Sequence, residues 1–244
     1  MSTSVFAPKR FFRLISSDAV NISRDPTLLF ATLLSVVPTI IAATLWTTAN
    51  AAVEAQFGLA GFMGYMVPFI SCLPPLLIGW VTGFLFLEDR DDGPLMALDV
   101  TPVGKAGFFA YRVSVTAFIA AAITLLAWFL LLAETGLGMA ILLMVLVALE
   151  AVAAALVLPA IARNKVEGLA LTKVTNLLSV APLIAIVPSP WRYLAAPIPT
   201  YWVGELLHIS GVDYLPFWLV AAIALVTHAA AAWGAFRLAI NRVG

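Results

Sequence analysis

Long apolar stretches, separated by short polar segments, dominate the pattern along this chain. A helix needs about 20 predominantly apolar residues to cross the hydrocarbon core of a bilayer. The pattern therefore predicts six membrane-spanning helices. They are expected at residues 27–47, 62–87, 108–132, 137–162, 174–189 and 214–236.

The stretches are continuous, whereas a transmembrane β-barrel needs alternating strands of about ten residues. Lipid offers the backbone no hydrogen-bond partner, so each stretch has to satisfy its own polar groups, as an α-helix does. The predicted fold class is therefore an all-α polytopic membrane protein. Gly79 and Gly83 lie one turn apart in the second stretch, which allows another helix to approach closely. Prolines are expected to kink two spans. They are Pro74, Pro75, Pro182 and Pro188.

Composition agrees with a lipid environment. Of the 244 residues 63% are apolar and 11% are charged, whereas a soluble domain carries roughly a quarter charged residues. The net charge of zero argues against a nucleic-acid partner. The single cysteine, Cys72, lies in an apolar stretch and is expected to be an inert buried thiol, outside any disulfide or metal site.

Basic residues orient the spans. If the N-terminus is cytoplasmic, all 13 Lys and Arg residues except Arg192 fall in cytoplasmic segments or beside them, as the positive-inside rule requires. Both termini are then cytoplasmic. Aromatic side chains gather at the outer boundary, where they suit the headgroup layer. They are Trp46, Trp191, Tyr193, Tyr201, Trp202 and Tyr214. Residues 190–213 are expected to be an interfacial or re-entrant segment.

Residues 8–24 show the periodicity of an amphipathic helix. The apolar face holds Phe11, Phe12, Ile15, Ala19 and Ile22, and the basic residues opposite are Lys9, Arg10, Arg13 and Arg24. Such a helix lies flat in the inner interface, with its basic face toward water and lipid phosphates; a simple topology anchor is the alternative. Asp25 is expected to cap the next helix and Pro26 to fit its first turn, so the chain turns sharply there.

The segment 88–105, between the second and third spans, begins with a charge cluster. Four carboxylates surround Arg90: Glu88, Asp89, Asp91 and Asp92. Gly93 and Pro94 then open a short helix, which Leu95 and Leu98 provide with an apolar edge and Pro102 closes. On composition alone a solvated acidic loop is favoured; a rigid helix on which a partner protein could push is the alternative.

These segments together resemble the membrane subunits of type-2 ABC transporters, which are mostly bacterial exporters. The basic helix that runs into Arg24, Asp25 and Pro26 looks like that family's interface helix. The stretch from Glu88 to Pro102 is similar to the family's signature after the second span, and Arg112 and the six-span plan also fit. Two residues depart from the family's pattern: Pro94 stands where Thr or Ser is common, and Met96 where Glu is common. Any salt bridge that this Glu makes in the family is therefore not expected here.

The resemblance implies a permease subunit in the plasma (inner) membrane of a bacterium, with the drug-export permeases as the suggested subgroup. A second permease copy or paralogue would complete the path, and separate ATP-binding subunits would hold ATP and Mg. This chain has no phosphate-binding loop of its own and is expected to bind no cofactor. The resemblance favours a coupling role for the first loop. The residues concerned are Glu88, Asp89, Arg90, Asp91, Gly93, Leu95, Leu98, Thr101 and Pro102.

Two ionisable residues lie at mid-membrane depth, Glu150 in the fourth span and His228 in the sixth. Such residues are costly there and normally face the bundle interior. They are candidates for a substrate contact or a proton relay; a neutral glutamic acid bonded to a neighbouring helix and a satisfied histidine are the alternatives. By analogy with the resembled architecture, the translocation path would also contain Phe69, Leu76 and Leu183.

Two further functions compete with the exporter permease. A self-contained channel or an ion-coupled transporter would depend on Glu150 and His228 and would need no ATPase. An intramembrane enzyme would need a Ser/His/Asp set or paired aspartates, and the spans contain neither arrangement.

Overall fold

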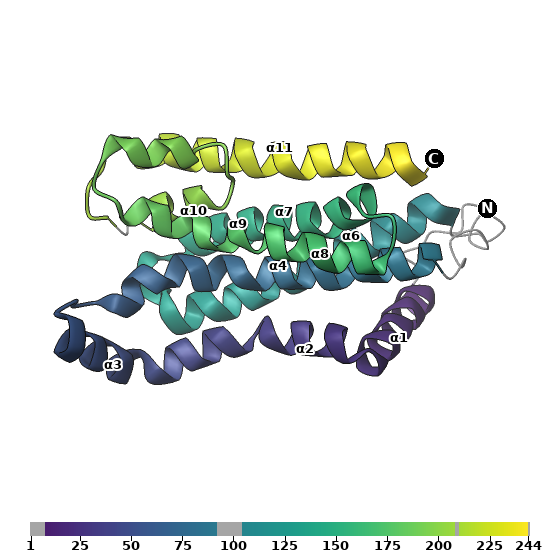
Figure 1. The fold of residues 1–244 in the computed structure, drawn as a ribbon, viewed down its shortest axis with the longest axis horizontal. Helices are drawn as coiled ribbons and strands as arrows, with labels where there is room; N and C mark the ends of the chain where they lie inside the picture. Colours follow the sequence, from purple (N-terminus) through teal and green to yellow (C-terminus); the bar gives the residue numbers. More distant parts are fainter. Residues whose placement is uncertain (1–7, 92–103, 208–209, 244) are drawn as a thin grey trace.

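The computed structural model describes residues 8–91, 104–207 and 210–243. In this part of the chain, six helical stretches are long and apolar enough to cross a membrane, as predicted. They run side by side in one bundle (Figure 1). The helical segments of the described residues are α1 Pro8–Arg24, α2 Pro26–Leu34, α3 Val37–Phe57, α4 Phe62–Asp91, α6 Gly104–Leu131, η1 Ala133–Thr135, α7 Leu137–Ile161, α8 Lys165–Thr175, α9 Leu177–Val180, η2 Ala181–Ile186, η3 Pro190–Ala195, α10 Tyr201–Leu206 and α11 Phe217–Val243. The chain is an all-α polytopic membrane protein.

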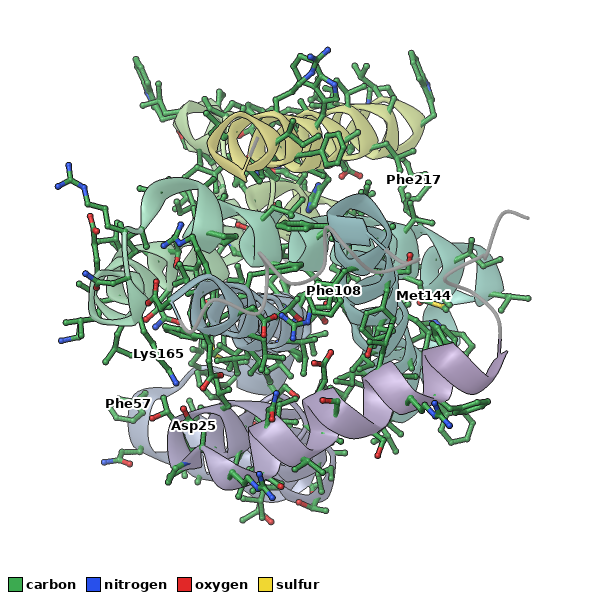
Figure 2. All side chains as sticks on the ribbon, turned by 90° about the vertical axis from the view of Figure 1, so that its right-hand side faces the viewer. Asp25, Phe57, Phe108, Met144, Lys165 and Phe217 are labelled. Carbon is green, nitrogen blue, oxygen red and sulfur yellow. The ribbon has the colours of Figure 1, made fainter. Side chains whose placement is uncertain are left out.

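Helix α1 spans Pro8–Arg24, as its periodicity predicts, and lies across one end of the bundle (Figure 2). The last turn of α11 lies at the same end, which is called the α1 end below (Figure 1). Asp25 caps α2, because its carboxylate accepts hydrogen bonds from the backbone N–H groups of Thr27 at 2.8 Å and Leu28 at 3.3 Å. Pro26 occupies the first turn of α2, so the chain changes direction between α1 and α2 without losing a hydrogen bond.

The first span is longer than the expected 27–47 and is broken. It extends from Pro26 to Phe57. Pro38 causes the break, because it has no N–H to donate and its ring crowds the carbonyl four residues earlier. Helix α2 therefore ends at Leu34, and Pro38 lies in the first turn of α3. Helix α3 continues beyond the apolar stretch because alanines and other helix-forming residues follow it. It ends at Gly58, which has a φ of +68°.

Helices α4 and α7 form the centre of the bundle. In the most apolar 18-residue part of α4, 94% of the residues are buried. The helix is continuous through its three internal prolines. A methyl group built on Gly79 would lie 2.5 Å from the Cβ of Ala154 and 2.6 Å from the carbonyl oxygen of Ala151, and Gly83 is similarly close to Leu158. The close helix approach expected at these two glycines is therefore confirmed, with α7 as the neighbour.

The fifth span also departs from the expected 174–189. It begins at Lys165, at the start of α8, and ends at Ile186. Its last part winds as the 3₁₀-helix η2 because Pro182 has no N–H to donate to the carbonyl of Leu178. That oxygen instead accepts from the N–H of Ala181 and from the hydroxyl of Thr200 at 2.5 Å. A neighbouring segment thus satisfies backbone that the proline leaves free.

Residues 190–207, in the predicted outer segment, fold back onto the bundle. Helix α10 packs against η2, α11 and α4 (Figure 1). Tyr201, Trp202 and Val203 on α10 are buried. Gly204 permits the contact with η2, because a methyl group there would lie 2.2 Å from the carbonyl oxygen of Pro182. Protein therefore covers the irregular backbone around α10, as an interfacial or a re-entrant segment requires.

Candidate functional site

Arg112 on α6 is the most buried charged group at the α1 end, with a side chain only 3% exposed. Its guanidinium pairs with Asp18 on α1 at 2.8 Å and with Asp89 near the end of α4. The hydroxyl of Tyr111 donates a further hydrogen bond to Asp18 at 3.1 Å. Arg112, Tyr111, Asp18 and Asp89 are called the Arg112 cluster below. They join three elements that are far apart in the sequence.

Aromatic rings enclose the guanidinium of Arg112. It lies 4.4 Å from the ring centre of Phe108 and 5.2 Å from that of Phe86. Phe11 of α1 meets Tyr111 edge to face at 5.6 Å between ring centres. These rings exclude water and strengthen the charge interactions of the Arg112 cluster. The interface helix is thus held to the bundle by its apolar face and by one buried ion pair.

Lys165, at the start of α8, forms a second junction at the α1 end. Its ammonium group lies 2.6 Å from the carboxylate of Asp25 and 3.7 Å from that of Glu88, and Figure 2 shows Lys165 and Asp25 facing each other. The backbone N–H of Lys165 also donates to Asp91 at 3.3 Å. Partial burial alone would raise the pKa of Asp25, but the hydrogen bonds from Lys165, Leu28 and Thr27 outweigh it and lower that pKa below 3.8.

Replacing Asp25 with alanine is expected to cost about 1 kcal/mol at neutral pH, mostly through the lost helix cap, because Lys165 is too exposed for the ion pair to contribute much. Since folding lowers the pKa of Asp25, the stabilisation is present above about pH 4 and is lost as the pH falls through the lowered value. Thermal unfolding of the purified protein at pH 7 and pH 3 measures this. The difference between wild type and variant should shrink at pH 3, whereas Glu54→Ala, in an exposed position, should show no such trend. An equal difference at both pH values would contradict the assignment.

Arg90 forms its hydrogen bonds with backbone carbonyls at the end of α7. Its guanidinium donates to the carbonyl oxygens of Pro159 at 3.2 Å and Ala162 at 2.9 Å. These are among the carbonyls that the C-terminus of α7 leaves without an intrahelical partner, and a cation there also suits the helix dipole. Arg90 therefore fastens the end of α4 to the end of α7.

The first four residues of the predicted coupling segment are thus engaged within the chain. Glu88, Asp89, Arg90 and Asp91 each contact another helix or its cap. The remaining predicted coupling residues lie outside the described part of the structure, as does the side chain of Arg10. They are Gly93, Leu95, Leu98, Thr101 and Pro102. Arg13 and Arg24 are exposed on α1, as a basic face requires.

At the opposite end of the bundle, Arg192 and Glu205 form a buried ion pair that sequence reasoning missed. Their side chains are 1% and 6% exposed, with 2.7 Å between Nε and the carboxylate. Arg192 also donates to Ser210 at 2.7 Å and to the carbonyl of Val212 at 2.8 Å, and Tyr201 donates to Glu205. An arginine alone in an aromatic segment, with one glutamate nearby in sequence, was the available signal. This pair holds η3 and α10 together, and the contacts with Ser210 and Val212 attach those two residues to η3.

A partly open cavity of about 170 Å³ lies between α4, α7, α8, α9 and α11, and Pro199 and Thr200 before α10 also line it. Leu76, Glu150 and His228 all line it. Three of the five residues predicted for a translocation path are therefore brought together. The other two, Phe69 and Leu183, do not line this cavity.

Glu150 and His228 are both buried, at 6% and 1% exposure. The thiol of Cys72 approaches Glu150, but neither carboxyl oxygen has a hydrogen-bond partner of normal geometry among the described residues. Nδ1 of His228 lies 2.8 Å from the carbonyl oxygen of Ala224, and Nε2 has no partner in the same part of the chain. Cys72 lies on α4, so the alternative of a glutamic acid bonded to a neighbouring helix is met only by this one thiol contact.

The fold defines a polytopic membrane protein in which helix α1 is joined by buried charges to α4 and α6, and comparison with known proteins defines its family. The chain belongs to the family of fluoroquinolones export permease proteins like Rv2686c, whose pattern matches residues 18–236. Two similar proteins of Mycobacterium tuberculosis are the fluoroquinolones export permease proteins MT2760 (strain CDC 1551 / Oshkosh) and Rv2686c (strain ATCC 25618 / H37Rv). Each is 28% identical over 252 residues, which cover 96% of both chains. No solved structure matches the chain. The resemblance to drug-export permeases, first indicated by short motifs, is thereby confirmed.

Proposed function

We propose that this chain is the membrane-spanning permease subunit of an ATP-driven exporter in a bacterial plasma membrane. A second copy or a paralogue would complete the translocation path. Separate ATP-binding subunits, which carry ATP and Mg, would act on the α1 end from the cytoplasm. Membership of an export permease family supports the transport role. The relatives' names make fluoroquinolones, or amphipathic aromatic drugs in general, the proposed cargo.

The Arg112 cluster is the observation that carries the coupling proposal. Asp89 belongs to the start of the predicted coupling segment and shares Arg112 with Asp18 of the interface helix. Because both ion pairs are largely buried, a displacement of this end of α4 would move α1 and α6 with it. A push on the loop would therefore reach three helices together, as an exporter driven from the cytoplasm needs.

The experiment is reconstitution of the chain with and without an ATP-binding protein that co-purifies with it. In inside-out vesicles, uptake of a fluorescent fluoroquinolone should require both proteins and ATP. It should stop when the ATPase carries a substitution that blocks hydrolysis. Leu95→Ala combined with Leu98→Ala should leave ATP hydrolysis intact and abolish uptake, because these side chains form the predicted contact edge. Arg90 is unsuitable for this test because it also holds the end of α7.

The buried Glu150 and the free Nε2 of His228 support one competing function, a self-contained proton- or ion-coupled transporter. The chain alone, in vesicles with an imposed pH gradient, separates the two functions. Drug uptake without any ATPase would overturn the ATP-driven exporter and support the competitor. Uptake that depends strictly on the ATPase would exclude it.

A further inference from the structure

The cavity that holds Glu150 and His228 has walls that are otherwise almost entirely apolar. Leu76 and Trp80 come from α4, and Val157 and Leu158 from α7. Residue Leu178 of α9 and residue Ala231 of α11 line the remaining sides. An ionised carboxylate alone in such surroundings is strongly disfavoured, so a charged Glu150 needs a cation beside it.

The polar groups in the walls are mainly hydrogen-bond acceptors. A carbonyl oxygen can only accept, so Nδ1 of His228 carries the hydrogen in its contact with Ala224, and Nε2 of the neutral ring keeps its lone pair. The hydroxyl of Thr200 donates to Leu178 and that of Thr175 to Leu171, so their free lone pairs also accept. With the two oxygens of Glu150, the walls offer acceptors to a ligand that brings donors.

The size of the cavity limits what it can enclose. A dry cavity of about 150 Å³ is large enough to bind benzene, whereas whole drug-sized ligands occupy pockets of roughly 300–1,000 Å³. The 170 Å³ found here matches one ring with an attached amine. The rest of a larger ligand would extend between α11 and the α8–α9 segment, which pack against other helices and hardly against each other.

We propose that this cavity binds the protonated amine end of an amphipathic aromatic substrate, with Glu150 as its counter-ion. The ammonium donates to the Glu150 carboxylate and to Nε2 of His228, and the ring to which it is attached lies among Trp80, Val157 and Leu158. An aromatic wall favours a cation further. The proposal rests on the export function, because it names where the exported molecule is held and by which chemical group.

Binding of two small probes by the purified full-length chain in lipid nanodiscs tests the proposal. Benzylamine is a cation and benzyl alcohol a neutral molecule of the same shape and size. The wild-type chain should bind benzylamine at least tenfold more tightly, as measured by calorimetric titration. Glu150→Gln keeps the shape of the side chain and removes the charge, so it should abolish that preference and leave the affinity for benzyl alcohol unchanged. Glu134→Gln, an exposed carboxyl in η1, is the matched control and should change neither affinity.

A second variant keeps the test decisive if Glu150→Gln does not fold. Ala231→Leu places a larger side chain in the cavity and should weaken both probes together. Equal binding of the two probes by wild type, or a preserved preference in Glu150→Gln, would overturn the proposal.

Norfloxacin and its N-acetyl derivative, which lacks the protonated amine, then separate the site from the function. If benzylamine binds through Glu150 and norfloxacin is not exported, the site stands and the export proposal fails.

Discussion

Replacing Arg112 with methionine is expected to destabilise the α1 end of the bundle by about 3–5 kcal/mol and to abolish export. The substitution removes the shared partner of Asp18 and Asp89, which would leave two largely buried carboxylates unpaired next to the rings of Phe86 and Phe108. The expected structural result is release of α1 from the bundle. Thermal unfolding of the purified variant and protease sensitivity of α1 measure it.

The physical cause of that loss can be tested by removing the stranded charges. Asp18→Asn and Asp89→Asn, combined with Arg112→Met, leave neutral groups of similar volume, and should recover most of the stability, because a buried ion pair contributes little beyond its own desolvation cost. Arg163→Met, at an exposed position, is the matched control and should change stability by less than about 0.5 kcal/mol. If the triple variant is as unstable as Arg112→Met alone, the stranded charges are not the cause.

Replacing Gly79 with leucine is expected to prevent α4 and α7 from packing. A methyl group at this position already lies 2.6 Å from a backbone oxygen of α7, which cannot move without displacing the whole helix. Gly79→Ala should therefore cost about 1–3 kcal/mol, and Gly79→Leu more than that, with loss of folded protein. Size-exclusion chromatography after expression, followed by thermal unfolding of any folded fraction, distinguishes the two variants.

A glycine that no other helix approaches provides the control for Gly79. Gly234 lies in α11 with no atom within 4 Å of a methyl group built on it. Gly234→Leu makes the same change of composition in another spanning helix and should leave expression and stability close to wild type. If both leucine variants fail equally, added hydrophobic bulk rather than the α4–α7 approach is responsible.

Helix α4 connects the parts of the molecule on which the proposals depend. Leu76 and Trp80 line the cavity, Gly79 faces α7, and Asp89 belongs to the Arg112 cluster. The predicted coupling segment begins in its last turn, at Glu88. Because one continuous helix carries the cavity wall and the loop, a shift of α4 along or about its axis would alter both. The Glu150 cavity and the proposed ATPase contact would then be coupled without a chain of intermediate residues.

The sequence alone could predict the number of spans and the amphipathic helix, because both depend on local pattern. Hydropathy sets the number of spans, because each must fill the bilayer with its own residues. The bounds of α1 follow from helical periodicity, and its junction with α2 from the local chemistry of Asp25 and Pro26. The bounds of the first and fifth spans were wrong because hydropathy does not register the break before Pro38, the polar end of α3 or the early start of α8.

Only the tertiary structure decided which charged groups meet. The cluster around Arg90 reads as a solvated acidic loop, yet Arg90 binds carbonyls 69 and 72 residues away and Arg112 binds Asp18 at a separation of 94 residues. Likewise, the sequence marks Glu150 and His228 as costly without showing that they line one cavity. Hydropathy is a property of each segment by itself, whereas these contacts depend on how helices distant in sequence pack, which no local pattern encodes.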